Sequence, residues 1–224
     1  MKGNTKQLIS LFLNIVIVIL TFVGIYLTFF VRTKDGYFLT KGISNFKYFT
    51  VLSNVFCGAV ALIYLIELIT RRADKSKATG KYLCVIRILK VMAVTAVGLT
   101  FVQIIAFLGP LYGYAKMYKG ANLYFHLIIP ILAMVDYIVT DLGDIPFRDT
   151  IWGIVPTLLY GVIYYINIII NGIGEWPNGN DWYGFMNWGM PGAIAIMAGS
   201  LFVSFLIGCI LRKLNSICAT RRSP

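Results

Sequence analysis

The chain has 224 residues, and its composition excludes most classes of soluble protein. Residues of the apolar set AVILMFWYC make up 58% of it, charged residues make up 13%, and the mean hydropathy is +0.78. Soluble domains contain about 25% charged residues, and disordered chains are poor in apolar side chains, so neither class fits. A disulfide-stabilised secreted fold is also excluded, because three of the four cysteines lie within apolar runs. These exclusions predict an all-α polytopic membrane protein.

Six apolar stretches are long enough to cross a bilayer, which takes about 20 helical residues. No long polar segment separates them, so we expect one integral membrane domain over residues 1–224. The first stretch is too long for the apolar core of a signal peptide and lacks a small-residue cleavage site, which predicts a retained helix. In chain order, the helices are expected at about 7–30, 48–70, 82–108, 122–140, 150–170 and 188–211.

The basic residues predict the orientation and account for the net charge of +11. Most of them lie in the short segments between apolar runs, without the basic stripe and interleaved aromatic residues of a nucleic-acid-binding protein. With both termini in the cytoplasm, 12 basic residues lie on the inner side and six on the outer side, in agreement with the positive-inside rule. We therefore predict a multi-pass cell-membrane protein whose partners are membrane lipids and not nucleic acid. The sequence identifies no protein partner.

Four ionisable residues lie within the predicted spans. Glu67 is near the inner end of the second helix, Arg87 and Lys90 are in the inner third of the third helix, and Asp136 is deep in the fourth. Charges at similar depth in a membrane neutralise each other or extend towards the interface. We expect the two acids to pair with Arg87 or Lys90. A proton-relay or substrate-ion role is the alternative.

His126, the only histidine of the chain, is predicted near the outer end of the fourth helix. It shares a helical face with Asn122 and Pro130, and a histidine suits proton transfer near neutral pH. Pro130 has no amide hydrogen, so the carbonyl of His126 is expected to bind a polar neighbour. The alternative is an interfacial histidine bonded to a lipid headgroup or a neighbouring helix. No Cys, Asp or Glu lies at ligand spacing from His126, so we predict neither a metal site nor a cofactor.

The second helix begins with a polar face at the same side of the membrane. Thr50, Ser53 and Asn54 are spaced at i, i+3 and i+4 in an otherwise apolar segment. Thr50 could act as a nucleophile if a base lies beside it. The alternative is a helix start at which Thr and Ser bond backbone carbonyls.

The segment 175–185 joins the fifth and sixth helices and is rich in aromatic residues, among them Trp182. Trp and Tyr prefer the membrane interface, so an aromatic belt explains most of this segment. A lid over an outward-facing cavity is the second interpretation.

Two strings, Phe46-Lys47-Tyr48-Phe49-Thr50 and Asn122 to Pro130 (NLYFHLIIP), resemble the androgen-induced protein family, which includes the androgen-dependent regulators of tissue factor pathway inhibitor. These are multi-helix membrane threonine hydrolases that cleave fatty acid esters of hydroxy fatty acids. The resemblance implies that Thr50 is the nucleophile and His126 the base. The continuation Leu52-Ser53-Asn54 resembles bacterial integral membrane proteins that have the same Tyr-Phe-Thr and His motifs. This resemblance implies that the chain is a bacterial homologue of the family.

The resulting hypothesis is a lipid ester hydrolase that acts within the outer leaflet. Thr50 attacks the ester, His126 moves the proton, and polar neighbours bind the substrate or the oxyanion. The candidates for that last role are Tyr48, Ser53, Asn54, Asn122, Tyr124 and Trp182. Two other functions fit the sequence: a substrate-binding membrane subunit of a small-molecule transporter, and a lipid-binding membrane protein without catalysis.

Overall fold

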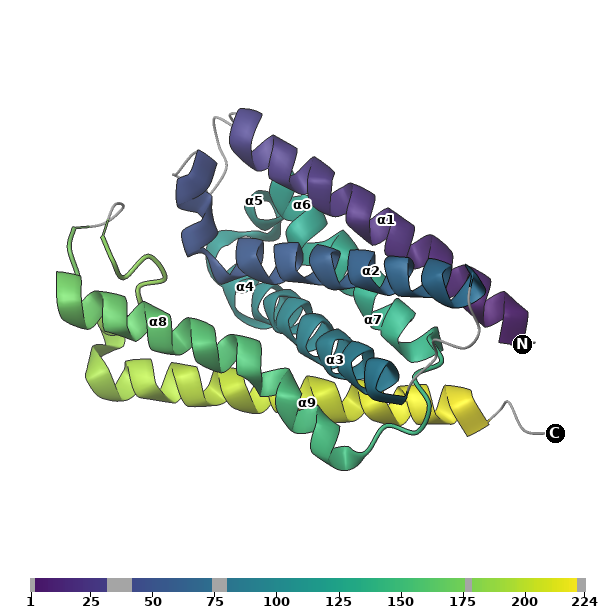
Figure 1. Ribbon diagram of the computed structural model, residues 1–224. Coiled ribbons are helices and arrows are strands. Elements are labelled where there is room, and N and C mark those ends of the chain that lie inside the picture. Colours follow the sequence, from purple (N-terminus) through teal and green to yellow (C-terminus); the bar gives the residue numbers. More distant parts are fainter. Residues whose placement is uncertain (1–2, 32–41, 74–79, 176–178, 221–224) are drawn as a thin grey trace.

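The computed structural model describes residues 3–31, 42–73, 80–175 and 179–220, and these residues form an all-α bundle without strands (Figure 1). The longest elements are α1 (Gly3–Phe30), α2 (Phe49–Ala73), α3 (Gly80–Gln103), α7 (Ile129–Val139), α8 (Val155–Asn171) and α9 (Gly189–Thr220). Shorter elements extend or join them: η1 (Gly42–Lys47), η3 (Ile104–Leu108), α4 (Gly109–Tyr112), α5 (Tyr114–Met117), α6 (Ala121–Leu123), η4 (Tyr124–Ile128), η5 (Phe147–Ile154) and η6 (Phe185–Trp188).

Six continuous helical segments are long and apolar enough to cross a membrane, which confirms the predicted number. They are Thr5–Phe30, Phe49–Thr70, Leu83–Tyr112, Ala121–Val139, Phe147–Asn171 and Phe185–Ala219. The last helix continues eight residues beyond its predicted end at 211, and the fifth starts three residues earlier than predicted, at Phe147. Both extensions contain polar residues, which hydropathy alone assigns to loops.

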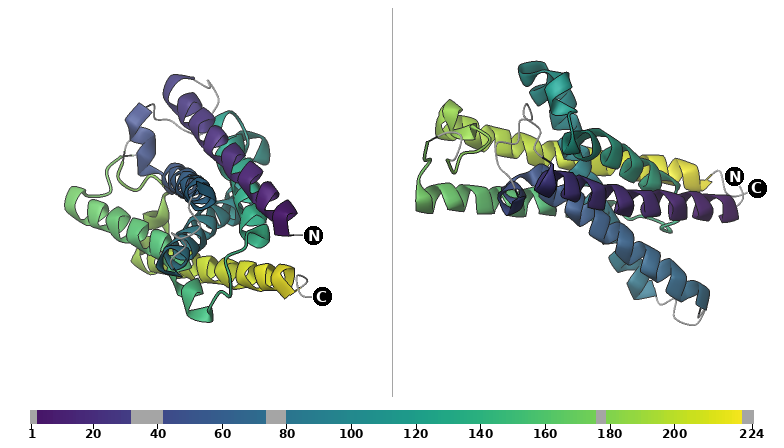
Figure 2. Two further views of the ribbon diagram at one scale, coloured as in Figure 1. Left: turned by 45° about the vertical axis from the view of Figure 1, so that its right-hand side comes forward. Right: turned by 90° about the horizontal axis from the view of Figure 1, so that it is seen from above.

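The helices run alternately up and down, so both termini lie at the same end of the bundle (Figures 1 and 2). We call this end the termini end and the opposite one the loop end. The common side of the two termini agrees with the predicted topology. Residues Gly42–Lys47 of η1, the start of α2 and the segment between α8 and α9 all belong to the loop end.

α3 is the central helix, in contact with α2, α7, α8, α9 and η5. Its residues from Lys90 to Thr100 are almost all buried, and Ala96 and Val97 have no exposed surface. By contrast, α1, α8 and α9 present large apolar side chains to the outside, such as Phe22 and Ile169. A helix that is buried all round beside helices with apolar outer faces is the arrangement expected for a bundle in lipid.

α1 approaches its neighbours closely at two glycines. A Cβ added to Gly58 of α2 would lie 2.7 Å from Cγ2 and Oγ1 of Thr21. One added to Gly24 of α1 would lie 2.4 Å from the ring of Phe125. Small residues at such crossings allow membrane helices to pack at short distance.

Candidate functional site

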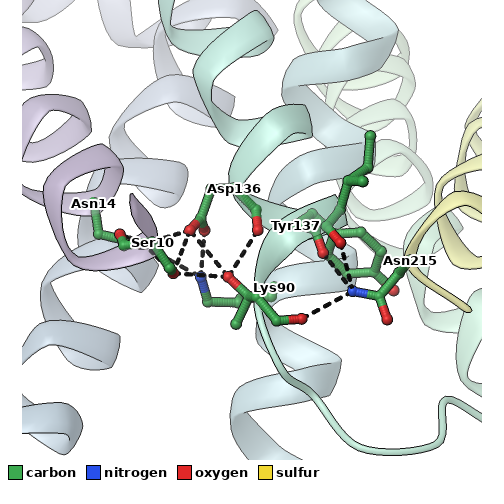
Figure 3. A network of polar contacts seen from close by, with 8 residues as sticks. Ser10, Asn14, Lys90, Asp136, Tyr137 and Asn215 are labelled. Atoms are coloured by element: carbon green, nitrogen blue, oxygen red, sulfur yellow. Dashed lines mark hydrogen bonds and ion pairs between the residues drawn. The ribbon is translucent and has the colours of Figure 1, made fainter. Parts of the chain in front are cut away.

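A buried ion pair joins α3 to α7 in the termini half of the bundle (Figure 3). The ammonium of Lys90 donates to Oδ2 of Asp136, and the two side chains are 5% and 6% exposed. Oδ1 of Asp136 accepts hydrogen bonds from Ser10 Oγ (2.6 Å) and Asn14 Nδ2 (2.7 Å) of α1 and from Thr140 Oγ1 (3.0 Å). The prediction that the two acids pair with Arg87 or Lys90 is thereby confirmed for Asp136. It is not confirmed for Glu67, since the ion pairs of these two bases in the described structure are with Asp136 and Asp149.

The remaining hydrogens of Lys90 also have acceptors. The ammonium lies 3.8 Å from the centre of the Tyr64 ring, which is a cation–π distance, and 3.4 Å from Oδ1 of Asn14. A lysine and a carboxylate whose donors and acceptors are all occupied are stable in a low-dielectric interior. This network therefore connects α1, α2, α3 and α7.

Asn215 of α9 closes the same region from the other side (Figure 3). Its Nδ2 donates to the carbonyls of Tyr137 (2.7 Å) and Thr140 (3.0 Å), where α7 ends. These carbonyls have no helical donor, because the last turn of any helix leaves its carbonyls without partners. Asn215 is 1% exposed, so it acts as a buried cap that joins the last helix to α7.

Arg87 pairs with an acid outside the predicted set of four ionisable residues. Its Nε donates to Asp149 Oδ2 (2.6 Å), and its Nη1 donates to the carbonyl of Asp144 (3.2 Å). The expected set of two acids and two bases is therefore incomplete, because Asp149 is the acid that neutralises Arg87. Asp149 precedes the predicted start of the fifth helix, whereas it lies within η5 in the structure and is buried.

Two cavities lie in the region of the polar network around the ion pair. One of about 440 Å³ lies at the termini end between α1, α2, α3 and the segment after α7, and is lined by Lys6, Gln7, Ser10, Tyr64, Glu67, Leu68, Leu83, Ile86, Asp141 and Gly143. The other, of about 20 Å³, lies deeper and has room for one water molecule. Lys90 and Asp136 line the deeper cavity, whereas the larger one is lined by Ser10 and Tyr64, which contact the ion pair. This volume at the termini end is within the range of small-molecule sites.

His126 lies at the loop end, in a π-helical turn that precedes α7. The residues Tyr124–Ile128 form this turn, η4, and the amide of Ile129 donates to the carbonyl of Tyr124, five residues earlier. His126 is 4% exposed, and its Nδ1 lies 2.6 Å from the carbonyl oxygen of Met117. A carbonyl only accepts hydrogen bonds, so Nδ1 carries a hydrogen, and in the neutral ring Nε2 carries the lone pair.

The carbonyl that Pro130 leaves without a donor is that of Phe125, and the expectation for the carbonyl of His126 is wrong by one residue. In an α-helix the nitrogen of Pro130 faces residue 126, but in the π-turn it faces residue 125. Asn54 of α2 supplies the missing donor, since its Nδ2 lies 3.0 Å from the Phe125 oxygen. A polar neighbour therefore replaces the helical donor at the carbonyl of Phe125, and not at that of His126 as predicted.

Asn54 joins the helix start that carries Thr50 to the turn that carries His126. Its Nδ2 also donates to the carbonyl of Thr50 (2.7 Å), and the residue has no exposed surface. Both amide hydrogens are thereby occupied, which excludes Asn54 as an oxyanion donor. The Oδ1 atom of Asn54 is buried and has no hydrogen-bond partner among the described residues.

Thr50 and His126 are brought to the same region of the bundle, but no hydrogen bond between their side chains is present in the described structure. Thr50 is half-buried, and its carbonyl accepts from Asn54 and from Ser53 Oγ (3.1 Å). Neither Thr50 nor His126 lines the two cavities at the ion pair or the third cavity described below. The hydrolase hypothesis places Thr50 and His126 on the wall of one outward-facing or laterally open cavity, and none of these three is that cavity.

The other candidate residues for binding the substrate or the oxyanion differ in whether their side chains already contact other protein groups. Ser53 Oγ lies 3.3 Å from Thr100 Oγ1 of α3, and Trp182 Nε1 donates to Tyr160 Oη (2.9 Å). The ring of Tyr48 packs against that of Tyr183, 6.0 Å between centres. Asn122 is 2% exposed, and its buried Oδ1 has no partner among the residues that the structure describes. Tyr124 packs half-buried against the main core.

The aromatic segment between α8 and α9 folds onto the start of α2. Asp181, which is buried, accepts from Tyr164 Oη and from the amides of Phe185 and Met186 (both 2.9 Å), and so fixes the turn before η6. Tyr183 Oη accepts the amide hydrogen of Phe49 (2.8 Å), one of the donors that a helix start leaves without a partner. Burial raises the pKa of Tyr183 to about 12, so this phenol stays neutral at physiological pH.

This segment covers an apolar cavity of about 80 Å³ between α3, α8 and α9. Its walls include Phe49, Phe107, Tyr160, Tyr183 and Phe185, together with the polar pair Gln103 and Ser200 (3.2 Å). The lid interpretation of the segment therefore has a structural counterpart. The neighbouring Lys47 lies over the rings of Tyr48 and Trp182, and burial lowers the pKa of its ammonium.

Comparison of the chain with protein-family models, with curated proteins and with solved structures finds no match. The resemblance of the two short strings thus depends on their residues alone. Three residues of the two sites were missed as candidates: Ser10, Asn14 and Asn215. Ser10 and Asn14 are polar residues within an apolar run, a signal that is visible in the sequence, whereas Asn215 lies beyond the predicted end of the last helix.

Proposed function

We propose that the protein is a lipid ester hydrolase of the cell membrane, with Thr50 as nucleophile and His126 as general base. The substrate class, fatty acid esters of hydroxy fatty acids, comes from the resemblance of the two strings to the androgen-induced protein family. The observation that supports the assignment best is the contact of 2.6 Å between His126 Nδ1 and the Met117 carbonyl. A histidine held through Nδ1 presents Nε2 as the base, which is the arrangement of the general base in acyl-transfer enzymes.

The proposed reaction has two steps. Thr50 Oγ attacks the ester carbonyl carbon while Nε2 of His126 takes the hydroxyl proton, and the imidazolium then protonates the departing alkoxide. A water molecule, deprotonated by the same Nε2, hydrolyses the acyl-threonine and restores both residues. The acyl chain enters laterally from the bilayer between the apolar outer faces of the helices. No carboxylate acts in this scheme, so the site is a dyad oriented by a backbone carbonyl.

The oxyanion needs hydrogen-bond donors, and the structure reduces the number of candidates. Asn54 and Trp182 donate to other protein groups. Asn122 and Tyr124, which lie on the turn before His126 and at the start of η4, remain in the proposal as donors. A single such donor stabilises a transition state by about 3 kcal/mol.

Covalent labelling tests this function directly. The purified chain in lipid nanodiscs is treated with a fluorophosphonate hydrolase probe, and the modified residue is mapped by mass spectrometry. Modification of Thr50 is expected, with loss of labelling in Thr50→Ala and in His126→Ala. Labelling of other residues only, or of none, would overturn the proposal.

The cavity of about 440 Å³ supports a second candidate function, the binding of a small polar molecule as a transporter subunit. Its wall combines hydroxyl, ammonium and carboxylate groups with Leu68, Leu83 and Ile86, and two of its lining residues, Ser10 and Tyr64, contact the Lys90–Asp136 pair. A thermal-shift screen with amino acids and water-soluble vitamins tests this function. A ligand that stabilises the wild type but not Leu68→Trp, which fills the cavity, would support it, and the absence of any such ligand would count against it.

A further inference from the structure

We infer that Asn54 is a positioning residue that fixes the backbone of Thr50 relative to that of His126. This inference rests on the proposed hydrolase function, because its purpose is to align nucleophile and base. Asn54 would act through these two residues and would not touch the substrate itself.

Asn54 supplies a hydrogen-bond donor to the carbonyl of Phe125, which the backbone leaves without one. Because Tyr124–Ile128 is a π-turn and Pro130 follows it, the carbonyl of Phe125 has no backbone donor. The same device occurs at η3, where Gly109 donates to Ile104, Pro110 follows, and Tyr114 Oη donates to the carbonyl of Ile105 (2.7 Å). At both turns a side chain replaces the donor that proline lacks. At η3 this side chain is close to the turn in the chain, whereas at η4 it comes from a different membrane span.

The carboxamide of Asn54 connects two backbone segments. Its two hydrogens are directed to the carbonyls of Thr50 (2.7 Å) and Phe125 (3.0 Å), and Phe125 is the residue directly before His126. One planar group thus spans the first turn of α2 and the turn of the proposed base. Two donors of one amide have a fixed angle between them, so the two backbone segments can move relative to each other only if a bond breaks.

The surroundings of Asn54 are buried and closely packed. Asn54 and Phe125 have no exposed surface, and the ring of Phe125 packs directly against Gly24 of α1. Water cannot replace either hydrogen bond at such a site, so the loss of the amide leaves the buried carbonyl of Phe125 without a donor and breaks the link to Thr50, whose carbonyl keeps the bond from Ser53 Oγ. An error of about 1 Å in the position of a reacting group can reduce a rate by about a hundredfold.

Asn215 provides a matched control in the same protein. It is also a fully buried asparagine, and its Nδ2 also donates to backbone carbonyls at one end of α7, but at the termini end. Asn54→Leu and Asn215→Leu remove the same group, keep a similar shape and each take the side-chain donor from buried backbone carbonyl oxygens, that of Phe125 in the first case and those of Tyr137 and Thr140 in the second. A purely structural role predicts similar consequences for both variants, whereas a positioning role does not.

The experiment measures the rate of Thr50 labelling by the fluorophosphonate probe between pH 5 and 9, for the folded fraction of each variant in nanodiscs. We expect Asn54→Leu to reduce the plateau rate by about tenfold to a hundredfold without a shift of the pH midpoint. We expect Asn215→Leu to remain within about twofold of wild type at a comparable loss of thermal stability. Asn54→Asp, which keeps the shape of the side chain but not its donors, is the second variant and should behave like Asn54→Leu.

Three outcomes would contradict this expectation. If both Asn54 variants label Thr50 as fast as wild type, the inference is wrong and the hydrolase function stands. If Asn54→Leu and Asn215→Leu lose labelling equally, Asn54 has only a structural role. If wild-type Thr50 is not labelled, the proposed function fails and the inference fails with it.

Discussion

Lys90 and Asp136, 46 residues apart in the chain, form an ion pair that is almost completely buried between α3 and α7. Ser10 and Asn14 bring α1 to the same carboxylate, so three spans depend on one acidic group. Inside a membrane such a group is stable only with its partners, because no water is present to replace them.

The pair should be much more sensitive to the loss of one member than to the loss of both. Lys90→Met leaves a buried carboxylate without its counter-charge and should reduce the free energy of unfolding by about 3–5 kcal/mol. The double variant Lys90→Met with Asp136→Leu removes both charges and should lose less than the sum of the single losses. Thermal or denaturant unfolding in detergent provides the comparison. Additive losses would show that the two residues do not act as a pair.

The crossing of α1 and α2 depends on the absence of a side chain at residue 58. Gly58→Ala places a methyl group 2.7 Å from Cγ2 of Thr21, and the neighbouring backbone must move to accept it. We expect a loss of about 1–3 kcal/mol in the free energy of unfolding. Gly199 is the control, because a Cβ added there meets no atom within 4 Å. Gly199→Ala should be neutral or stabilising, by up to about 1 kcal/mol, through helix propensity. Equal effects at the two glycines would contradict close packing at residue 58.

Much of the fold follows from hydropathy and charge. The number of spans is set by bilayer thickness, and the Lys90–Asp136 pair follows from similar depth, since a charge in lipid must find a partner. The pairing of Arg87 with Asp149 could not be predicted in this way. Asp149 lies in a polar segment that hydropathy assigns to a loop, while the folded chain continues the helix through it as η5.

The candidate site shows a different limit of the sequence. The position of Pro130 predicts a carbonyl without a donor, but the π-turn moves this carbonyl from His126 to Phe125. A shift of one residue in a helix rotates a carbonyl by about 100°, and this decides which neighbouring span can reach it. The role of Asn54 therefore depends on a local backbone feature that residue spacing does not reveal.

The predicted orientation can be tested with cysteine accessibility. Lys116 of α5 lies at the loop end and Lys213 of α9 lies towards the termini end, and both side chains are exposed. In a chain whose four native cysteines are replaced by serine, Lys116→Cys should react with a membrane-impermeant maleimide in intact cells. Lys213→Cys should react only after lysis, because the excess of basic residues places the termini in the cytoplasm. The reverse pattern would show that the termini lie outside, and it would place His126 in the inner leaflet.

The role of Thr50 is tested most sharply by two substitutions that differ in one group. Thr50→Ala removes the hydroxyl and should reduce hydrolysis of fatty acyl esters by purified protein to the background rate, with the fold intact by circular dichroism. Thr50→Ser keeps the hydroxyl and loses only a methyl group, so appreciable activity should remain. A threonine that only stabilises the start of α2 would make no such distinction in turnover between serine and alanine. His126→Ala should lose as much activity as Thr50→Ala, because residues that act as one catalytic unit are strongly non-additive. The double variant should accordingly be no slower than either single variant, and ester cleavage by Thr50→Ala at the wild-type rate would exclude Thr50 as the nucleophile.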